Sequence, residues 1–151
     1  EPFNLLEPRH ELTMIGRSYA IGYEPDLDET LLHRPMRHAL DADTPWAVWY
    51  PLRRGGAFER LPREEKMEIL KEHGIIGMAY GAHDLAQDVR LASHALDAAD
   101  NEFTIGLMGR ELTPLSKLVE TMRSTRQTSE FITSLGPFFV GHAVWRRPMA
   151  L

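Results

Sequence analysis

The feature that most constrains the fold is the order of six periodic segments in the last two thirds of the chain. Apolar residues alternate in four of them, as in strands, and recur every three or four residues in the other two, as in helices. The pattern predicts, in chain order, a strand at 46–54, a helix at 62–74, strands at 89–96 and 102–110, a helix from 113, and a strand at 136–145. This is the order of a split βαβ unit. We therefore expect an α+β, ferredoxin-like fold: an antiparallel sheet with both helices on one face.

The first strand, residues 46–54, carries two polar side chains of interest. Its alternation places Tyr50, Leu52 and Arg54 on one face, with Tyr50 and Arg54 about 13 Å apart along the strand. Pro51 has no N–H for a ladder, which predicts an edge strand or a bulge at that position. A tyrosine near a strand end also commonly packs with its hydroxyl in water, so a structural role for Tyr50 stays open.

The first helix contains a histidine with two readings. Pro62 and the acidic Glu64 and Glu65 predict its start, and Gly74 predicts its end. His73 falls on or beside the apolar stripe. It is either a core histidine whose ring nitrogens are satisfied by backbone groups, or an axial ligand to a cofactor iron, which requires a neutral and rigidly held imidazole.

The flanking segments are less regular. Residues 11–23 predict a strand with a bulge or turn near Gly16, and residues 24–30 predict a turn. Pro35 pushes Arg34 toward an extended conformation, which places His33 on a connecting segment rather than in a helix. We expect residues 1–40 to be the tail of a preceding, largely missing ferredoxin-like domain, and residues 41–151 to form the cofactor-binding domain.

The second helix is predicted to begin at Thr113 as N-cap, with Pro114 in its first turn. Its buried stripe would consist of apolar residues at helical spacing, namely Leu115, Leu118, Val119 and Met122. Arg123 lies on another side of this helix, and Thr128 lies just beyond it.

Composition excludes several kinds of site. The chain has no cysteine, which rules out disulfides, thiolate catalysis and iron–sulfur clusters. The net charge of -5 argues against a nucleic-acid partner. No apolar run approaches the ~20 residues of a membrane span, and no secretory signal is evident. These features are compatible with a cytoplasmic location.

Four motifs in one order carry a family resemblance: TPWAVWYPLRR, LPREEKMEILKEHGIIGMAY, LVETMR and GPFFVG. Together, over residues 32–141, they resemble the C-terminal half of the chlorite dismutase family, and within it the actinobacterial type of coproheme decarboxylase. The resemblance implies a dimeric α/β-barrel type of ferredoxin-like fold with coproheme or haem b as cofactor. It also implies hydrogen peroxide as a partner and a homo-oligomer, with a pentamer favoured.

The resemblance also implies site residues. The family motif L-x-x-H-G places the iron ligand at His73, and the Y-P-[FML] strand places the residue that begins propionate chemistry at Tyr50. Leu52 is the third residue of that strand motif and is implied to contact the cofactor. The cofactor rim is implied to be held by Arg54, Arg123 and Thr128.

On the opposite, distal face of the cofactor the resemblance implies His33, within His33-Arg34-Pro35, as the base that deprotonates peroxide. True chlorite dismutases carry a distal arginine, for which Arg90 is the candidate, and Gln87 is a further alternative. The chain departs from the family at Met78, at Phe103 and in the length of segment 81–89, so the register of Arg90 stays open.

Three functions remain after this step. The first is peroxide-dependent decarboxylation of two coproheme propionates to give haem b. The second is decomposition of chlorite to chloride and O₂, which a distal Arg90 would favour. The third is a haem carrier or sensor, or a cofactor-free assembly module in which His73 belongs to the core.

Overall fold

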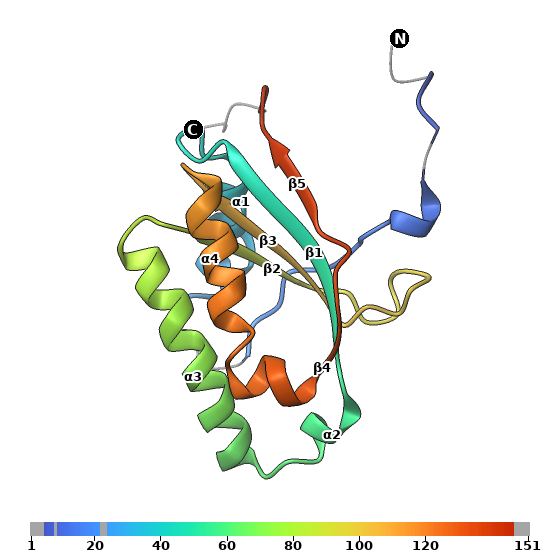
Figure 1. Cartoon of the computed structure of the whole chain (residues 1–151), viewed down its shortest axis with the longest axis vertical. Helices are drawn as coiled ribbons and strands as arrows, with labels where there is room; N and C mark the ends of the chain where they lie inside the picture. The colour runs from blue at the N-terminus through green and yellow to red at the C-terminus, as the bar shows by residue number, and fades with distance from the viewer. Residues whose placement is uncertain (1–4, 8, 22–23, 147–151) are drawn as a thin grey trace.

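The computed structural model describes residues 5–7, 9–21 and 24–146 of the chain. Within them it confirms the α+β, ferredoxin-like architecture, with one antiparallel sheet and the two long helices on one face (Figure 1). The strands are β1 (Trp46–Arg54), β2 (Gln87–Ala92), β3 (Phe103–Gly109), β4 (Ile132–Leu135) and β5 (Phe139–His142). The sheet order is β2-β3-β1-β4, and β5 pairs with β1 as well. The central strand β1 therefore contacts three others.

The helices are α1 (Arg34–Leu40), α2 (Gly56–Glu59), α3 (Arg63–Ala82) and α4 (Leu112–Met122). Two π-helical turns, Glu29–His33 and Gln127–Phe131, and a short 3₁₀ turn, His10–Leu12, complete the regular structure of the described residues. None of the helices in the described part of the chain is long and apolar enough to span a bilayer.

Pro51 is tolerated in a way that the sequence did not predict. β1 is not an edge strand, and its bulge lies between Arg53 and Arg54 rather than at the proline. β5 pairs with β1 as far as Trp49 and β4 begins at Leu52, so the missing N–H of Pro51 faces the gap between them. The Pro51 carbonyl still accepts a hydrogen bond from the Gly136 N–H at 2.9 Å.

The main core lies between the sheet and α4. Val48, Tyr50 and Leu107 of the sheet pack against Leu115 and Leu118 of α4, as the apolar stripe of that helix predicts. Leu115 is fully buried. This layer fixes the spacing between the sheet face and the helices.

Helix α3 continues eight residues beyond its predicted end at Gly74, so that prediction is wrong. A glycine inside a helix costs about 1 kcal/mol relative to alanine. The residues after Gly74 recover this cost, because Ile76 and Tyr80 pack against the main core. His73 therefore lies in the middle of α3, held on both sides by helix.

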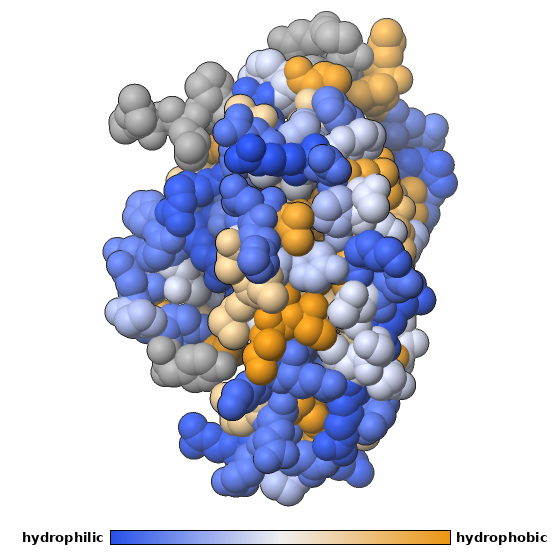
Figure 2. Space-filling model, turned by 60° about the vertical axis from the view of Figure 1, so that its left-hand side comes forward, coloured by the Kyte–Doolittle hydropathy of each residue, from blue (hydrophilic) through white to orange (hydrophobic). Residues whose placement is uncertain are grey.

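The outer face of α3 is apolar as well. Ile75 is 51% exposed and Met78 is 68% exposed. Figure 2 shows apolar side chains gathered within a polar surface on the side of the molecule where α3 lies.

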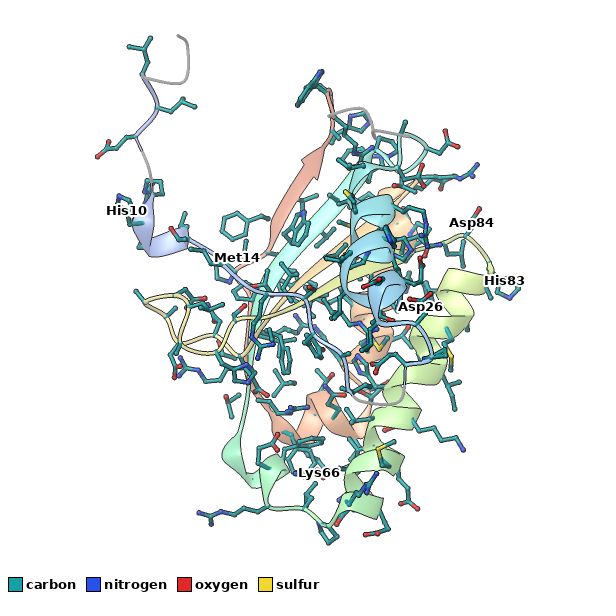
Figure 3. The ribbon with its side chains drawn as sticks, turned by 180° about the vertical axis from the view of Figure 1, so that it is seen from behind. His10, Met14, Asp26, Lys66, His83 and Asp84 are labelled. Carbon is teal, nitrogen blue, oxygen red and sulfur yellow. The ribbon has the colours of Figure 1, made fainter. Side chains whose placement is uncertain are left out.

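The N-terminal part differs most from the prediction. Instead of a strand over residues 11–21, Arg17 alone bridges Ala92 at the end of the edge strand β2. Gly16 allows this approach, because a Cβ there would lie 2.5 Å from Leu91 Cβ. Figure 3 shows this segment from behind as it passes from His10 and Met14 to Asp26. Tyr23, the predicted end of the strand, lies outside the described residues.

Other boundaries also shift. The predicted turn at 24–30 becomes helical from residue 27, and His33 ends a π-helical turn that continues into α1 instead of lying on a connecting segment. Pro35 fits there because it occupies the first turn of α1. The N-cap of α4 is Glu111 rather than Thr113. The predicted strands at 89–96 and 136–145 are shorter, ending at Ala92 and spanning Phe139–His142.

Candidate functional site

The sheet face beneath α3 and α4 carries a row of three cross-strand neighbours. Tyr50 of β1 is paired with Ile105 of β3, which is paired with Arg90 of β2. Paired residues in antiparallel strands stand on the same face, and neighbouring strands are about 4.8 Å apart. The backbones at Tyr50 and Arg90 are therefore about 10 Å apart. The register thus brings a phenol and a guanidinium onto one wall.

Tyr50 lies deep in this wall. It is 9% exposed, and its ring stacks against Phe138 at a centroid distance of 4.7 Å. Burial raises the pKa of the Tyr50 hydroxyl far above its ordinary value, and the negative charge of Asp88 raises it further. Tyr50 therefore keeps its hydroxyl proton at neutral pH. The predicted facing of Tyr50 and Leu52 is confirmed, since both join the core on the helix side.

His73 approaches the same space from α3. Burial lowers the pKa of its imidazole, and the nearby Arg90 lowers it further, against smaller opposing effects of Glu72 and Asp88. The imidazole is therefore neutral at pH 7, the form that binds a metal.

The tautomer of His73 follows from its neighbour Thr125, which is 1% exposed. The Thr125 hydroxyl donates to the Met122 carbonyl at 2.7 Å, and its oxygen lies 3.4 Å from His73 Nδ1. Because the contact with Met122 is the shortest of the three that this hydroxyl makes, we assign its one proton there, and Thr125 then accepts from His73. Nδ1 then carries the imidazole proton and Nε2 keeps a free lone pair. Nothing in the sequence pattern pointed to Thr125.

Arg54 is held by acidic groups at the end of β1. Its Nη2 lies 2.8 Å from Glu102 and 3.1 Å from Glu59, and its guanidinium stacks on Phe58 at 4.0 Å. The Arg54 Nε is buried and has no hydrogen-bond partner among the described residues. A cofactor carboxylate could use this donor, but it would have to share Arg54 with Glu102.

The two other predicted rim residues lie around the end of α4. Arg123 is exposed at the C-cap of α4. Thr128 is half-buried and lies 3.3 Å from the Thr125 hydroxyl, so it belongs to the polar group next to His73. The adjacent Gln127 has a buried side-chain oxygen without a partner in the described part of the protein.

The distal candidates occupy different places. His33 is exposed, and it does not line the cavity that lies at the edge of β2 next to α1. Gln87 stands at the start of β2, paired with Met108, on the face opposite to that of Tyr50. Arg90 lines the cavity and is on the Tyr50 face. Of these three predicted candidates, only Arg90 both lines this cavity and stands on the Tyr50 face.

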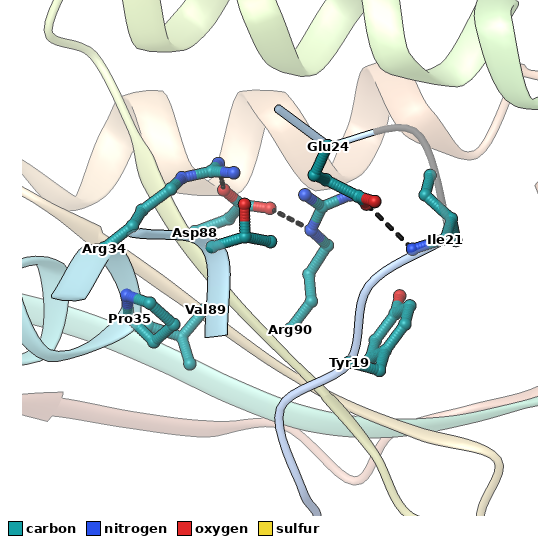
Figure 4. A pocket seen from close by; sticks show the side chains of 9 residues that line it. Tyr19, Ile21, Glu24, Arg34, Pro35, Asp88, Val89 and Arg90 are labelled. Carbon is teal, nitrogen blue, oxygen red and sulfur yellow. Dashed lines mark hydrogen bonds and ion pairs between the residues drawn. The ribbon is translucent and has the colours of Figure 1, made fainter. Parts of the chain in front are cut away.

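Figure 4 shows the cavity itself, at the edge of β2 next to α1. In its wall, Asp88 forms ion pairs with two arginines. Arg34 Nη2 on α1 lies 2.7 Å from Asp88 Oδ1, and Arg90 Nε on β2 lies 2.8 Å from Asp88 Oδ2. Tyr19 also points into it, and burial raises the pKa of the Tyr19 hydroxyl while Arg90 opposes the rise. Sequence reasoning missed Tyr19 and Asp88. The sequence does carry a signal for Asp88, because residues two apart on one strand share a face and Asp88 stands two residues from Arg90.

These residues suit an iron porphyrin in their chemistry. A porphyrin occupies four positions around its iron and needs one axial ligand from the protein, which a neutral imidazole with a free Nε2 supplies. Its carboxylates need cations, and Arg54 offers an unused buried donor. No group of three or more His, Asp or Glu side chains that could hold a bare metal ion occurs among the described residues.

Comparison with known proteins identifies relatives. The family model described as chlorite dismutase matches residues 18–144. A solved structure titled a novel heme-binding protein, from Thermus thermophilus, is 25% identical, with a TM-score of 0.60 over 66% of this chain and 40% of that chain. A putative chlorite dismutase is 19% identical, with a TM-score of 0.58 over 66% and 43% of the two chains.

A third structure, chlorite dismutase from Candidatus Nitrospira defluvii in complex with imidazole, is 17% identical, with a TM-score of 0.59 over 73% and 46% of the two chains. The chain thus spans less than half the length of these relatives. A search of the curated proteins finds no match.

Proposed function

The chain belongs to the chlorite dismutase family, and from that premise we propose that it binds coproheme through His73 and decarboxylates two of its propionates with hydrogen peroxide. The proposal is supported by a buried and protonated Tyr50 in the core that the sheet forms with the helices, and by a neutral His73 on α3, the helix whose Ile76 and Tyr80 pack against that core. The 25% identical heme-binding protein from Thermus thermophilus supports the cofactor class.

In this proposal His73 Nε2 would bind the iron, while Thr125 holds the other ring nitrogen, Nδ1. Arg54, Arg123, Thr128 and Leu52 would hold the rim of the cofactor. The bound iron porphyrin supplies the oxidising chemistry of peroxide. Tyr50 would pass the oxidising equivalent to a propionate through its hydroxyl O–H. Each propionate would lose CO₂, one proton and two electrons to become a vinyl group, and one peroxide would take up the two electrons, that proton and one further proton from solvent to give two waters.

Proton transfer from peroxide requires a group on the distal side. His33 is the base that the motif implies, and it would have to turn inward from its exposed position. Arg90, which already lines the cavity, can stabilise a deprotonated peroxide by its positive charge.

A second candidate function, chlorite decomposition, is favoured by one observation. Arg90 stands in the same cross-strand row as Tyr50, and its positive charge lowers the pKa of His73. A guanidinium at that place can hold an anionic oxidant such as chlorite.

One experiment separates these functions. The protein is loaded with coproheme and titrated with hydrogen peroxide, while mass spectrometry follows the porphyrin and an oxygen electrode follows a parallel chlorite titration. Stepwise loss of two propionates without O₂ release supports the decarboxylase. Rapid O₂ release from chlorite with an unchanged porphyrin supports the second candidate. If neither propionate loss nor O₂ release occurs, the remaining function is haem binding alone.

A further inference from the structure

The segment that follows α4 is attached to α3 through Arg126. Its Nη2 lies 2.7 Å from Glu65 Oε1, and its main-chain N–H donates to Glu72 Oε2 at 2.9 Å. Glu65 and Glu72 are seven residues apart, which is about two turns of a helix, so they stand on one side of α3. Arg126 therefore joins the start of the π-helical turn Gln127–Phe131 to α3 at two points along that helix.

The residue before Arg126 is Thr125, which contacts His73. Thr125 Oγ1 lies 3.4 Å from His73 Nδ1. Glu72, which accepts from the Arg126 N–H, is the residue before His73. Two consecutive residues of α3 thus contact two consecutive residues of the segment after α4. Because the main chain is continuous, the attachment of Arg126 limits where the Thr125 hydroxyl can lie.

The other end of this segment is held differently. Phe131 packs against Ile69 of α3 in a second buried cluster, which also contains Phe58. This apolar contact should keep the segment on α3 without Arg126. The side chains of Arg126 and Glu65 are 41% and 34% exposed, and an ion pair exposed to this extent adds little to overall stability. Loss of the pair should therefore shift the Thr125 end without unfolding the protein.

Building on the proposed function, in which His73 binds iron, we propose that Arg126 is a positioning residue for that ligand. Through Glu65 and Glu72 it holds the Thr125 hydroxyl at His73 Nδ1, which keeps the imidazole proton on Nδ1 and the lone pair on Nε2. A hydrogen bond at the second ring nitrogen fixes the orientation of a metal-binding imidazole and raises its basicity.

The test compares the two carboxylates that pair with Arg126, in the cofactor-free protein, with the ¹⁵N NMR signals of the His73 ring as the measurement. In the intact chain Nδ1 should carry the proton. Glu65→Gln and Arg126→Gln should each shift the ring signals toward the form protonated at Nε2. In the Arg126→Gln background Glu65→Gln should add no further shift, because both changes remove the same pair. Arg126→Lys, which can keep one pair with Glu65, should restore most of the original signal.

The matched control is Glu130→Gln. Glu130 lies 3.0 Å from the same guanidinium but belongs to the same segment as Arg126, so this pair cannot attach the segment to α3. Its loss should leave the His73 signals unchanged. Equal shifts from Glu65→Gln and Glu130→Gln would show a general charge effect and overturn the proposal. An unshifted ring in Arg126→Gln, or a ring protonated at Nε2 in the intact chain, would overturn it as well.

The haem-loaded ferrous protein gives an independent measurement. The iron–imidazole stretching frequency in its Raman spectrum should fall in Arg126→Gln, because His73 becomes a less basic ligand when Nδ1 loses its partner. An unchanged frequency would contradict the positioning role. If the protein takes up no haem, the proposed function fails, and the NMR comparison in the cofactor-free protein still decides whether Arg126 positions His73.

Discussion

The wall formed by β1, β3 and β2 and the rim segments, residues 24–40 and 123–131, carry the predicted site residues other than His73, and they differ in what holds them. Tyr50 and Arg90 on the wall are placed by backbone register across three strands. His33 and Arg123 on the rim are exposed, at the end of a π-helical turn and at a helix C-cap. The comparison teaches that wall residues should act through fixed geometry, whereas rim residues must move or be ordered by a ligand.

The largest effect is expected from a single wall atom. Tyr50→Phe removes only the hydroxyl and leaves the stacking on Phe138 in place. Coproheme binding should weaken by about 1 kcal/mol at most, while propionate loss should fall below detection in the mass-spectrometric assay. Decarboxylation at the wild-type rate would remove Tyr50 as the reacting group.

The rim gives the next largest effect. If His33 turns inward as the base for peroxide, His33→Ala should slow decarboxylation by about 10²–10⁴-fold. Raising the pH should restore part of the rate, because more peroxide arrives deprotonated. His38→Ala on α1 is the comparison variant, and His33→Ala with an unchanged rate and pH profile would assign the proton transfer to solvent or to another residue.

Stability should separate the buried layer from the surface without any cofactor. Leu115→Ala, in a fully buried position under the wall, should lower the free energy of unfolding by about 2–5 kcal/mol. Ile75→Ala on the outer face of α3, where the side chain is 51% exposed, should change it by about 0.5 kcal/mol or less. Urea unfolding measures both, and equal costs would mean that the outer face of α3 is buried in solution, for example by self-association.

The smallest effect concerns the pH dependence of stability. Burial and Arg90 lower the pKa of His73 in the folded protein, so the unfolded chain binds a proton first as the pH falls below about 6.5. His73 should therefore contribute a loss of stability as the pH falls from about 6.5 through its lowered folded pKa. His73→Gln should show a shallower decline in urea unfolding across this range. A decline of the same size in both proteins would place the titration elsewhere.

The same contrast explains how much could be predicted from the sequence. The alternation of residues 46–54 and 102–110 predicted the wall correctly, because the period of two is set by backbone geometry alone. The stripe of Leu115 and Leu118 likewise predicted which side of α4 is buried. These are local patterns, and they place Tyr50 without further information.

The rim and the charged cavity depend on contacts between distant segments, which local patterns do not carry. The proline after Arg34 predicts extended chain, although it fits the first turn of a helix once α1 packs against β2. Gly74 predicts a helix end, although α3 continues past it because Ile76 and Tyr80 pack against the main core. Asp88 and Thr125 are identified only by their contacts in the folded protein: Asp88 pairs with Arg34 and Arg90, and Thr125 contacts His73.

The most direct test of the account is a titration of the protein with ferric haem or coproheme, followed by absorbance, in the intact chain and in two histidine variants of α3. His73→Ala should abolish tight binding while circular dichroism shows an unchanged fold. His83→Ala, at the exposed C-cap of the same helix, should bind as the intact chain does. Equal affinity and identical spectra for His73→Ala and the intact chain would contradict His73 as the iron ligand, and with it the site described between α3 and the sheet.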